Sequence, residues 1–301
     1  MHTLFVLLGP TGVGKTDLAI RIAQRLNSPI LNADSRQIYR EIPITTAAPT
    51  AAQLAAVRHY FVGTIPLEAY FSAAQYEAEV MALLPQLFNE HDSILMSGGS
   101  MLYIDAVCKG IDDIPTVDEQ TRAMMHQRLE EDGLETLCEE LRLLDPLTYT
   151  NIDRRNTRRV VHALEICYQT GRPYSAFLSH THKERPFRIV RIGLMRERAD
   201  LFNRINKRVD DMVAQGLEQE ARRVYPKRQL NSLNTVGFKE MFRYIDGEWT
   251  LAQATEKIKR NTRVYAKKQM TWFKKDADIH WFTPEEEDKI FRFIDTELRK
   301  G

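Results

Sequence analysis

The 301-residue sequence contains few cysteines and no long hydrophobic run. Cys108, Cys138 and Cys167 are widely spaced and form no C-x-x-C pair, which argues against disulfides or a zinc site and favours reduced thiols in a cytoplasmic protein. No apolar stretch approaches the ~20 residues of a membrane span, and the short run Leu4–Leu8 lacks the features of a signal peptide. The length predicts one large domain and a smaller one.

The sequence also has almost no net charge, +1, but its charges are unevenly distributed. Between Arg154 and Lys275 there are 28 lysines and arginines and 12 acidic residues, whereas the remainder has 14 and 29. Tyr, Phe and Trp residues are interspersed among these basic residues. The asymmetry favours a polyanionic partner for the basic part of the chain; the alternative is a solvated helix surface with scattered ion pairs.

A glycine-rich segment near the N-terminus fits the phosphate-loop pattern G-x-x-x-x-G-K-[ST]. It follows an apolar run and precedes a segment with helical periodicity. The glycines let backbone N–H groups surround an anion at the positive end of the helix, the lysine adds a charge, and the threonine hydroxyl suits Mg²⁺. The alternative is an ordinary glycine turn. The residues predicted to bind linked phosphates are Gly9, Pro10, Thr11, Gly12, Val13, Gly14, Lys15 and Thr16, with Thr16 as the metal ligand.

Two further segments are predicted strands that end in polar residues. Residues 29–35 carry Asp34 at the end of one strand, and residues 93–97 lead into Gly98-Gly99-Ser100. Ligands bind beyond the carboxyl ends of strands in open α/β sheets, so both ends are predicted beside the phosphate loop. Asp34 is a helix cap, a metal ligand or a general base. Ser100 suits donation to a phosphate oxygen, although Gly-Gly-Ser alone is also typical of a plain turn.

The order of the predicted elements indicates an α/β fold with an insertion. Helices are predicted at 118–131, 134–144 and 154–169, with no clear strand among them. A strand at 187–194 returns to the sheet, and the last strand lies at 279–282. We therefore predict a P-loop NTPase-like core of residues 1–113 and 186–301, with a parallel sheet flanked by helices, and an all-helical domain inserted at 114–185. Residues 42–66 are predicted to be a long functional loop, and residues 71–88 a helix with Ser72 as its N-cap.

The residues leave three functions open. A nucleoside or metabolite kinase fits the phosphate loop, but the strand at 93–97 ends in Ser97 and offers no Walker B acid. The basic, aromatic-containing part of the chain is also larger than a small substrate requires. An enzyme acting on nucleic acid is therefore favoured, and an RNA-binding module with an inactive loop is the third possibility.

Six motifs, in order between Thr3 and Phe282, resemble those of the tRNA dimethylallyltransferases, also called tRNA isopentenyltransferases or the IPP transferase family. This family modifies the adenosine adjacent to the anticodon. The motifs are GPTGVGKT (9–16), NADSRQIYR (32–40), SGGSMLYIDAV (97–107), DRRNTRRVVHALEICYQTGRPYS (153–175), LNTVGFKE (233–240) and NTRVYAKKQMTWFKK (261–275).

The resemblance implies transfer of a dimethylallyl group from dimethylallyl diphosphate to N6 of adenosine 37, next to the anticodon, in tRNAs that read codons beginning with U. The product is N6-(dimethylallyl)adenosine. Diphosphate is the leaving group, so catalysis needs donors and Mg²⁺ directed at it. Besides the loop, Ser100 and Arg263 are the implied catalytic donors, and Asp34 matches the general base that accepts the amine proton.

The resemblance also implies contacts with the anticodon stem-loop of tRNA, whose target base must leave the stack. The protein is expected to act in the cytoplasm as a monomer and to have no membrane partner. The implied tRNA contacts are Asp34, Ser35, Arg36, Gln37 and Ser100 around the base, Arg122, Arg158, Arg159, Val160, Val161 and His162 in the insertion, and Asn234, Thr235, Val236, Gly237, Phe238, Lys239, Lys267, Lys268, Gln269, Trp272 and Lys274 on the core.

Three departures from the family pattern are visible. Ser100 stands where the family usually has threonine, so the hydroxyl is kept. Ala48 stands where the family has lysine, which removes any phosphate or tRNA contact by that side chain. The zinc-finger tail of eukaryotic relatives is absent, which suggests a bacterial or minimal form.

Overall fold

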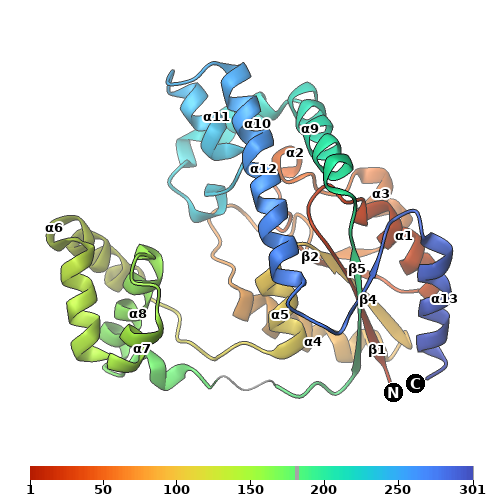
Figure 1. Cartoon of the computed structure of the whole chain (residues 1–301), viewed down its shortest axis with the longest axis horizontal. Helices are drawn as coiled ribbons and strands as arrows, with labels where there is room; N and C mark the ends of the chain where they lie inside the picture. Colours follow the sequence, from red (N-terminus) through yellow and green to blue (C-terminus); the bar gives the residue numbers. More distant parts are fainter. Residues whose placement is uncertain (180–182, 301) are drawn as a thin grey trace. The chain divides into compact units, whose positions relative to one another are not determined.

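The computed structural model describes residues 1–179 and 183–300. The chain forms two compact units (Figure 1), one of Met1–Lys109 with the chain from Glu184 onward and one of Gly110–Lys183. The predicted boundaries of the insertion were 114 and 185. Within the described residues, no helix combines the length and the apolar character needed to cross a membrane.

A parallel sheet forms the centre of the first unit. Its strands are β1 (Thr3–Leu8), β2 (Ile30–Ala33), β3 (His59–Tyr60), β4 (Ser93–Gly98), β5 (Arg188–Leu194) and β6 (Ile279–Phe282). The strand order is β3-β2-β4-β1-β5-β6, and every pair is parallel. Gly98 pairs with both Leu8 and Ala33, so β1, β2 and β4 end at the same level. The predicted α/β fold with a parallel sheet is confirmed.

Helices cover both faces of the sheet, because the side chains of β1 alternate between them. Leu4, Val6 and Leu8 belong to one core with residues of α4 and α5. Phe5 and Leu7 belong to the other core, with residues of α1 and α13. Figure 1 shows α9, α10, α11 and α12 grouped beyond the sheet. The longer helices of this unit are α1 (Lys15–Leu26), α4 (Ala73–Phe88), α5 (Met101–Lys109), α9 (Arg198–Ala214), α10 (Leu217–Val224), α11 (Phe238–Ile245), α12 (Leu251–Phe273) and α13 (Glu287–Leu298).

Local sequence signals explain where several helices begin. Ser72 precedes α4, and its side chain accepts a hydrogen bond from the backbone N–H of Gln75, whose side chain accepts one from Ser72 in return. This reciprocal cap confirms the N-cap predicted at Ser72. Thr250 and Gln253 form the same capping box at the start of α12.

The second unit is helical and has its own small core. Its helices are α6 (Glu119–Leu144), α7 (Pro146–Asn151) and α8 (Thr157–Thr170). Gly133 interrupts α6 with φ 77° and ψ 167°, between the two helices that the sequence predicted. Asp145 is 1% exposed and accepts hydrogen bonds from the backbone N–H and hydroxyl groups of Thr148 and Ser175, which ties α7 to the chain after α8.

Two predictions about secondary structure were wrong. Residues 42–66 are not one long loop, because they contain α2 (Pro43–Thr46), α3 (Ala51–Ala56) and β3. The buried Glu220 carboxylate binds the N–H groups of Ile44 and Thr45, so a distant residue caps α2. Helix α8 begins at Thr157, not at Arg154, because Asn156 caps it by accepting from the N–H of Arg159.

A buried ion pair attaches the segment before β5 to the helices on one face of the sheet. Arg185 Nη2 lies 2.5 Å from Glu77 Oε1 of α4, and both side chains are 7% exposed. The same guanidinium donates to the carbonyl oxygens of Ala106 and Val107 in α5.

We expect Arg185→Met to lower the free energy of unfolding by about 3–5 kcal/mol, because the buried Glu77 carboxylate would lose the guanidinium that pairs with it. The double variant Glu77→Leu/Arg185→Met should recover a large part of that loss, since no buried charge is left. Urea unfolding of both variants followed by circular dichroism measures the difference. Additive losses in the double variant would contradict this account of the pair.

Candidate active site

The phosphate loop joins β1 to α1 at the carboxyl end of the strand. Gly9 lies so close to β5 that a Cβ atom would be 2.7 Å from the carbonyl oxygen of Leu194, and its φ of 152° also favours glycine. Gly14 is the residue before α1, with φ 106°. The loop therefore leads directly into the first turn of a helix, whose N–H groups form an anion site.

Lys15 lies within this loop and binds its backbone. Its ammonium Nζ donates to the carbonyl oxygens of Gly9, at 2.9 Å, and Pro10, at 2.8 Å. The pKa of Lys15 is lowered to about 7, chiefly by burial of the ammonium group and then by the Arg208 guanidinium, while the Asp34 carboxylate opposes the shift. An anion bound beside Lys15 would favour its charged form.

Three arginines bind residues of the loop. The bonds are Arg196 Nε to the carbonyl oxygen of Val13 at 2.8 Å, Arg204 Nε to that of Gly12 at 3.0 Å, and Arg208 Nη1 to the hydroxyl of Thr11 at 3.3 Å. Burial lowers the pKa of Arg208, and the Asp34 carboxylate acts in the opposite direction. Backbone carbonyls that would repel an anion are thus occupied by cations.

Arg208 was not predicted from the sequence. Its only signal was spacing, because Arg204 and Arg208 are four residues apart and lie on the same side of α9. Arg263, which the sequence predicted as a catalytic donor, is not among the side chains that line the two cavities described below. Its guanidinium instead donates to Asn206 Oδ1 at 2.5 Å and lies 5.9 Å from the centre of the Phe202 ring.

Asp34 follows β2 and closes the turn after it. Its Oδ1 accepts from the backbone N–H of Arg36 at 2.9 Å and from that of Gln37 at 3.3 Å. The capping role considered from the sequence is therefore present. The carboxylate is nevertheless accessible, because Asp34 lines both cavities at this edge of the sheet.

Ser100 lies beside Asp34 because β2 and β4 end in contact. A Cβ atom on Gly98 would be 2.1 Å from the carbonyl oxygen of Ala33, so only glycine fits there. The N–H of Ser100 donates to that same carbonyl at 3.1 Å. Ser100 Oγ accepts from the N–H of Ser35 at 2.8 Å and donates to the hydroxyl of Ser35 at 3.1 Å.

Two cavities meet at the ends of these strands. The larger, about 490 Å³, lies over the phosphate loop and is also lined by Gly98, Gly99 and Gln37. The smaller, about 350 Å³, is lined by Ser35 and Ser100 and has an apolar wall from α9 and α12. Five residues line both cavities and mark where they join: Thr11, Asp34, Thr46, Arg208 and Tyr265.

Gln37 and Arg36, which were predicted to contact the target base, hold neighbouring loops. The amide nitrogen of Gln37 donates to the carbonyl oxygens of Thr46, at 3.1 Å, and Ala47, at 3.0 Å. Arg36 Nη1 donates to the carbonyl oxygens of Asn231 and Ser232. The loop that contains Ala48, in place of the family's lysine, is therefore attached to the loop after β2.

The segment 234–239 lines the smaller cavity with five of its six residues, namely Asn234, Thr235, Val236, Gly237 and Lys239. Phe238 is 0% exposed and packs against Phe242 inside the core, so its side chain is not available to tRNA. The N–H of Gly237 donates to Glu240 Oε2 at 2.8 Å, which fixes the turn before α11.

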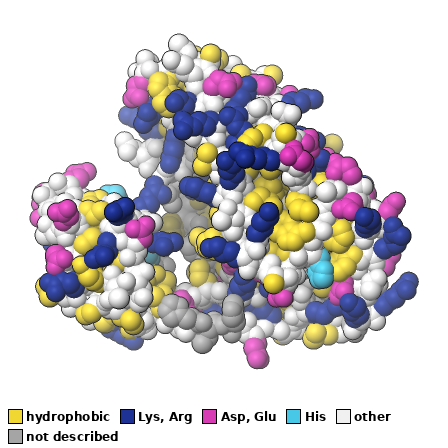
Figure 2. Space-filling model, in the orientation of Figure 1, with side chains coloured by type: hydrophobic (Ala, Val, Ile, Leu, Met, Phe, Trp, Pro, Cys, Tyr) yellow, Lys and Arg dark blue, Asp and Glu magenta, His cyan; other side chains and the backbone are white. Residues whose placement is uncertain are grey.

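Helix α12 carries the predicted contacts Lys267, Lys268, Gln269 and Trp272, and Lys274 follows it. The three lysines and Trp272 are exposed. Gln269 is 2% exposed and lines the larger cavity, so it faces the phosphate loop and not the outer surface. Figure 2 shows many Lys and Arg side chains over the part of the first unit that carries α9 to α12.

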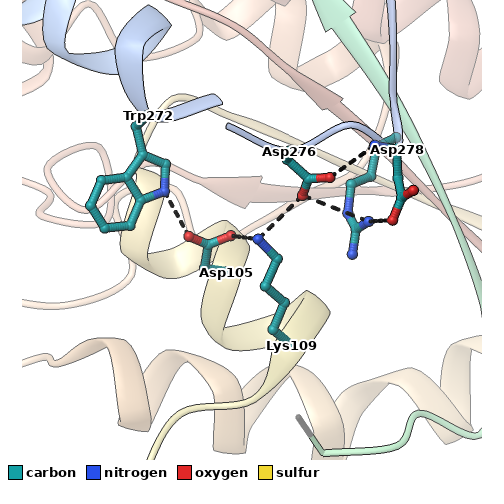
Figure 3. A network of polar contacts seen from close by, with 6 residues as sticks. Asp105, Lys109, Trp272, Asp276 and Asp278 are labelled. Carbon is teal, nitrogen blue, oxygen red and sulfur yellow. Dashed lines mark hydrogen bonds and ion pairs between the residues drawn. The ribbon is translucent and has the colours of Figure 1, made fainter. Parts of the chain in front are cut away.

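Trp272 also anchors the end of α12 (Figure 3). Its indole N–H donates to Asp105 Oδ2 of α5 at 2.6 Å. Lys109 Nζ lies 3.1 Å from Asp105 Oδ1 and 3.2 Å from Asp276 Oδ2, and Asp276 also pairs with Arg191 of β5. This network of charges fixes α12 to the helix that follows Ser100.

The predicted tRNA contacts in the second unit differ in how exposed their side chains are. Arg158 and Arg159 are exposed at the start of α8, and His162 is partly exposed with Nδ1 3.2 Å from Glu165 Oε2. Val160 and Val161 are 0% and 7% exposed and belong to the core of this unit, so their side chains pack inward. Arg122 of α6 is partly buried and donates to the carbonyl oxygen of Val117.

Among the described residues, no three His, Cys, Asp or Glu side chains come together as a metal-binding group. Residues with side-chain oxygens that suit a hard divalent cation line the larger cavity, among them Thr16, Asn32 and Asp34. The side chain of Thr16 is exposed. This donor set fits Mg²⁺ that takes most of its ligands from phosphates and water.

Comparison with known proteins identifies the family. The model of the IPP transferase family matches residues 37–276. The chain is 61% identical to tRNA dimethylallyltransferase 1 of Phocaeicola vulgatus over 97% of both chains. It is 57% identical to tRNA dimethylallyltransferase 1 of Bacteroides fragilis over 99% of both chains.

Two solved structures are also similar. The full-length tRNA isopentenylpyrophosphate transferase of Bacillus halodurans matches with a TM-score of 0.73 and 34% identity, over 100% of this chain and 98% of that one. A eukaryotic dimethylallyltransferase acting on tRNA matches with a TM-score of 0.79 and 26% identity, over 94% of this chain and 74% of that one. On the family model and on this identity over nearly full length, the chain belongs to the IPP transferase family.

Proposed function

We propose that the protein is a tRNA dimethylallyltransferase, which transfers the dimethylallyl group of dimethylallyl diphosphate to N6 of the adenosine next to the anticodon, position 37. The observation that carries the proposal is that Asp34 lines both the cavity over the phosphate loop and the adjoining smaller cavity. One carboxylate thus borders the place for a diphosphate and a second space for an acceptor. The relatives' names and the family support the same activity.

The larger cavity suits the diphosphate of the donor. Its N–H groups and the cations of Lys15 and Arg208 would balance the charge that builds on the bridging oxygen as the carbon–oxygen bond breaks. Ser35 and Ser100 hydroxyls lie nearby, at the rim of the smaller cavity. Arg208 replaces Arg263 in this assignment, because Arg208 lines both cavities.

The smaller cavity suits the extruded base. Val209, Met212 and Ile258 contribute an apolar wall, and Thr235 and Asn234 contribute polar groups, as expected for a flat heterocycle with polar edges. The N6 lone pair would form a bond to the allylic carbon, the electrons of the broken bond would leave with diphosphate, and Asp34 would accept the amine proton.

We assign Mg²⁺ to the Thr16 hydroxyl beside the bound diphosphate. When bound there, the ion would neutralise charge on the leaving group. We also assign the exposed basic residues of α12 and of the start of α8, including Lys267, Lys268, Arg158 and Arg159, to the phosphates of tRNA.

The direct test is incubation of the protein with unmodified tRNA, labelled dimethylallyl diphosphate and Mg²⁺, without ATP. Label should appear in RNA at the adenosine next to the anticodon and should be lost when Mg²⁺ is chelated. Transfer of phosphate from ATP to a small acceptor, without prenylation of RNA, would instead support the kinase alternative.

Replacing Asp34 tests the base. Asp34→Asn keeps an oxygen that accepts from the N–H groups of Arg36 and Gln37, so the turn should survive. The amide does not accept a proton, and we expect kcat to fall by about 10²–10⁴, while tRNA binding measured by filter retention stays within about twofold, because no phosphate contact is lost. Wild-type turnover in this variant would remove Asp34 from the role.

Variants of Arg208 and Arg263 test which arginine is the donor to the leaving group. Arg208 is assigned from the structure, and Arg263 was predicted from the sequence. Arg208→Met should lower kcat/KM for the donor by about 10²–10³, because a cation at the leaving group is lost. Arg263→Met removes a bond to Asn206 on α9, and its effect should be at least tenfold smaller. Steady-state kinetics with varied donor concentration compare the two. The reverse order would restore Arg263 as the leaving-group donor.

The salt dependence of tRNA binding tests the surface of α12. Lys268 is exposed, and no ion pair of its side chain occurs in the described part of the chain. Lys268→Ala should reduce the slope of log K against log salt by about one unit. Lys259→Ala is the matched control on the same helix, because Lys259 already pairs with Asp210 and Glu256. Equal slopes for all three proteins would place the tRNA elsewhere.

A further inference from the structure

A buried amide of α12 connects the phosphate loop to the end of β4. Gln269 Oε1 accepts from the backbone N–H of Thr11 at 2.9 Å, and its Nε2 donates to the carbonyl oxygen of Gly99 at 2.8 Å. The side chain is 2% exposed. Both ends of the amide are therefore used, and Thr11, Gly99 and Gln269 all line the larger cavity.

The two partners require a side chain that both donates and accepts. A carboxylate would satisfy the Thr11 N–H but would place a negative charge against the Gly99 carbonyl oxygen and beside the phosphate site. An apolar side chain would leave the Thr11 N–H and the Gly99 carbonyl oxygen buried without a hydrogen bond. This costs more free energy than an exposed hydrogen bond contributes. Glutamine is therefore matched to the position, and its two partners also fix which amide atom faces the loop.

Thr11 is held from two directions. Gln269 binds its backbone N–H, and Arg208 binds its hydroxyl. Because Thr11 N–H is used by Gln269, that N–H is turned away from the anion, and the N–H groups that remain for the diphosphate come from the following residues of the loop. Gln269 thus takes the Thr11 N–H out of the set of loop donors that are left for an anion.

The space around Gly99 shows how closely these groups are packed. A Cβ atom on Gly99 would be 2.6 Å from Gln269 Nε2, 3.4 Å from the carbonyl oxygen of Gly9 and 3.7 Å from Lys15 Nζ. A methyl group there would displace the glutamine amide, the flexible partner, before it displaced the backbone.

We propose that Gln269 is a positioning residue of the donor site, and that it acts by holding the phosphate loop against β4 rather than by contacting tRNA. The expected change in the donor KM rests on the proposed function. The expected change in affinity for inorganic diphosphate does not, because it depends only on the position of the phosphate loop. Gln269 lies on the same helix as the exposed lysines, yet its effect is confined to the phosphate side of α12.

Gln269→Met, which has a similar volume but no amide, tests the role. We expect the donor KM to rise about tenfold, while the tRNA KM stays within about twofold. Binding of inorganic diphosphate, measured by calorimetry without tRNA, should weaken by a similar factor. Asp105→Ala is the matched control, because it removes a different attachment of α12, the hydrogen bond from Trp272 to α5, without touching the loop. It should lower thermal stability and leave diphosphate affinity unchanged.

Gly99→Ala provides a second variant that does not remove the amide. It should weaken diphosphate binding to a similar extent in the wild type and add little in Gln269→Met, because both changes break the same connection. Absence of RNA prenylation by the wild type would refute the proposed function and leave the diphosphate measurement intact. A raised tRNA KM with unchanged diphosphate affinity in Gln269→Met, or full additivity with Gly99→Ala, would overturn the inference.

Discussion

The site depends on one constraint: the parallel strands β1, β2 and β4 end at the same level. Gly98 pairs with Leu8 on one side and Ala33 on the other, so the phosphate loop, Asp34 and Ser100 begin at the same edge. These groups lie far apart in sequence and meet only because the register is fixed. The contact between β2 and β4 is so close that a single Cβ atom at Gly98 would meet backbone. An error in this register would move Asp34 and Ser100 relative to the loop.

Positive charge is concentrated at this edge at an energetic cost. Burial and the neighbouring Arg208 lower the pKa of Lys15 to about 7, and burial lowers that of Arg208 itself. Asp34 is the acidic group that opposes both shifts, but the pKa values of Lys15 and Arg208 remain lowered. A bound diphosphate would supply the missing negative charge, so the arrangement favours an anionic ligand over an empty or neutral one. Asp34 and Arg208 both line the two cavities.

The sequence predicted the parts of the fold that local patterns determine. The phosphate loop, the strands at β2, β4, β5 and β6 and the cap at Ser72 follow from periodicity, glycine placement and hydrogen-bonding side chains. Helix α2 could not be predicted in the same way, because Glu220 of α10 supplies its cap. Arg208 was missed for a similar reason, because it binds the hydroxyl of Thr11, which is remote in sequence. Assigning whole motifs to tRNA also included Val160 and Phe238, although a helix turns every third or fourth residue inward.

Helix α12 shows why a motif should be divided by its faces. Ala266, Gln269 and Phe273 are buried, whereas Lys267 and Lys268 are exposed, and the spacing of three and four residues separates the two sets. In the proposed function, one motif therefore contains residues for two tasks: exposed lysines that bind a polyanion and a buried amide that holds the phosphate loop. Because α12 is also fixed to α5 through Trp272 and Asp105, both tasks are carried by one rigid element. In the proposed function, such a helix carries the RNA-binding lysines and the amide that binds the phosphate loop on one element, which favours precise placement of the base relative to the donor.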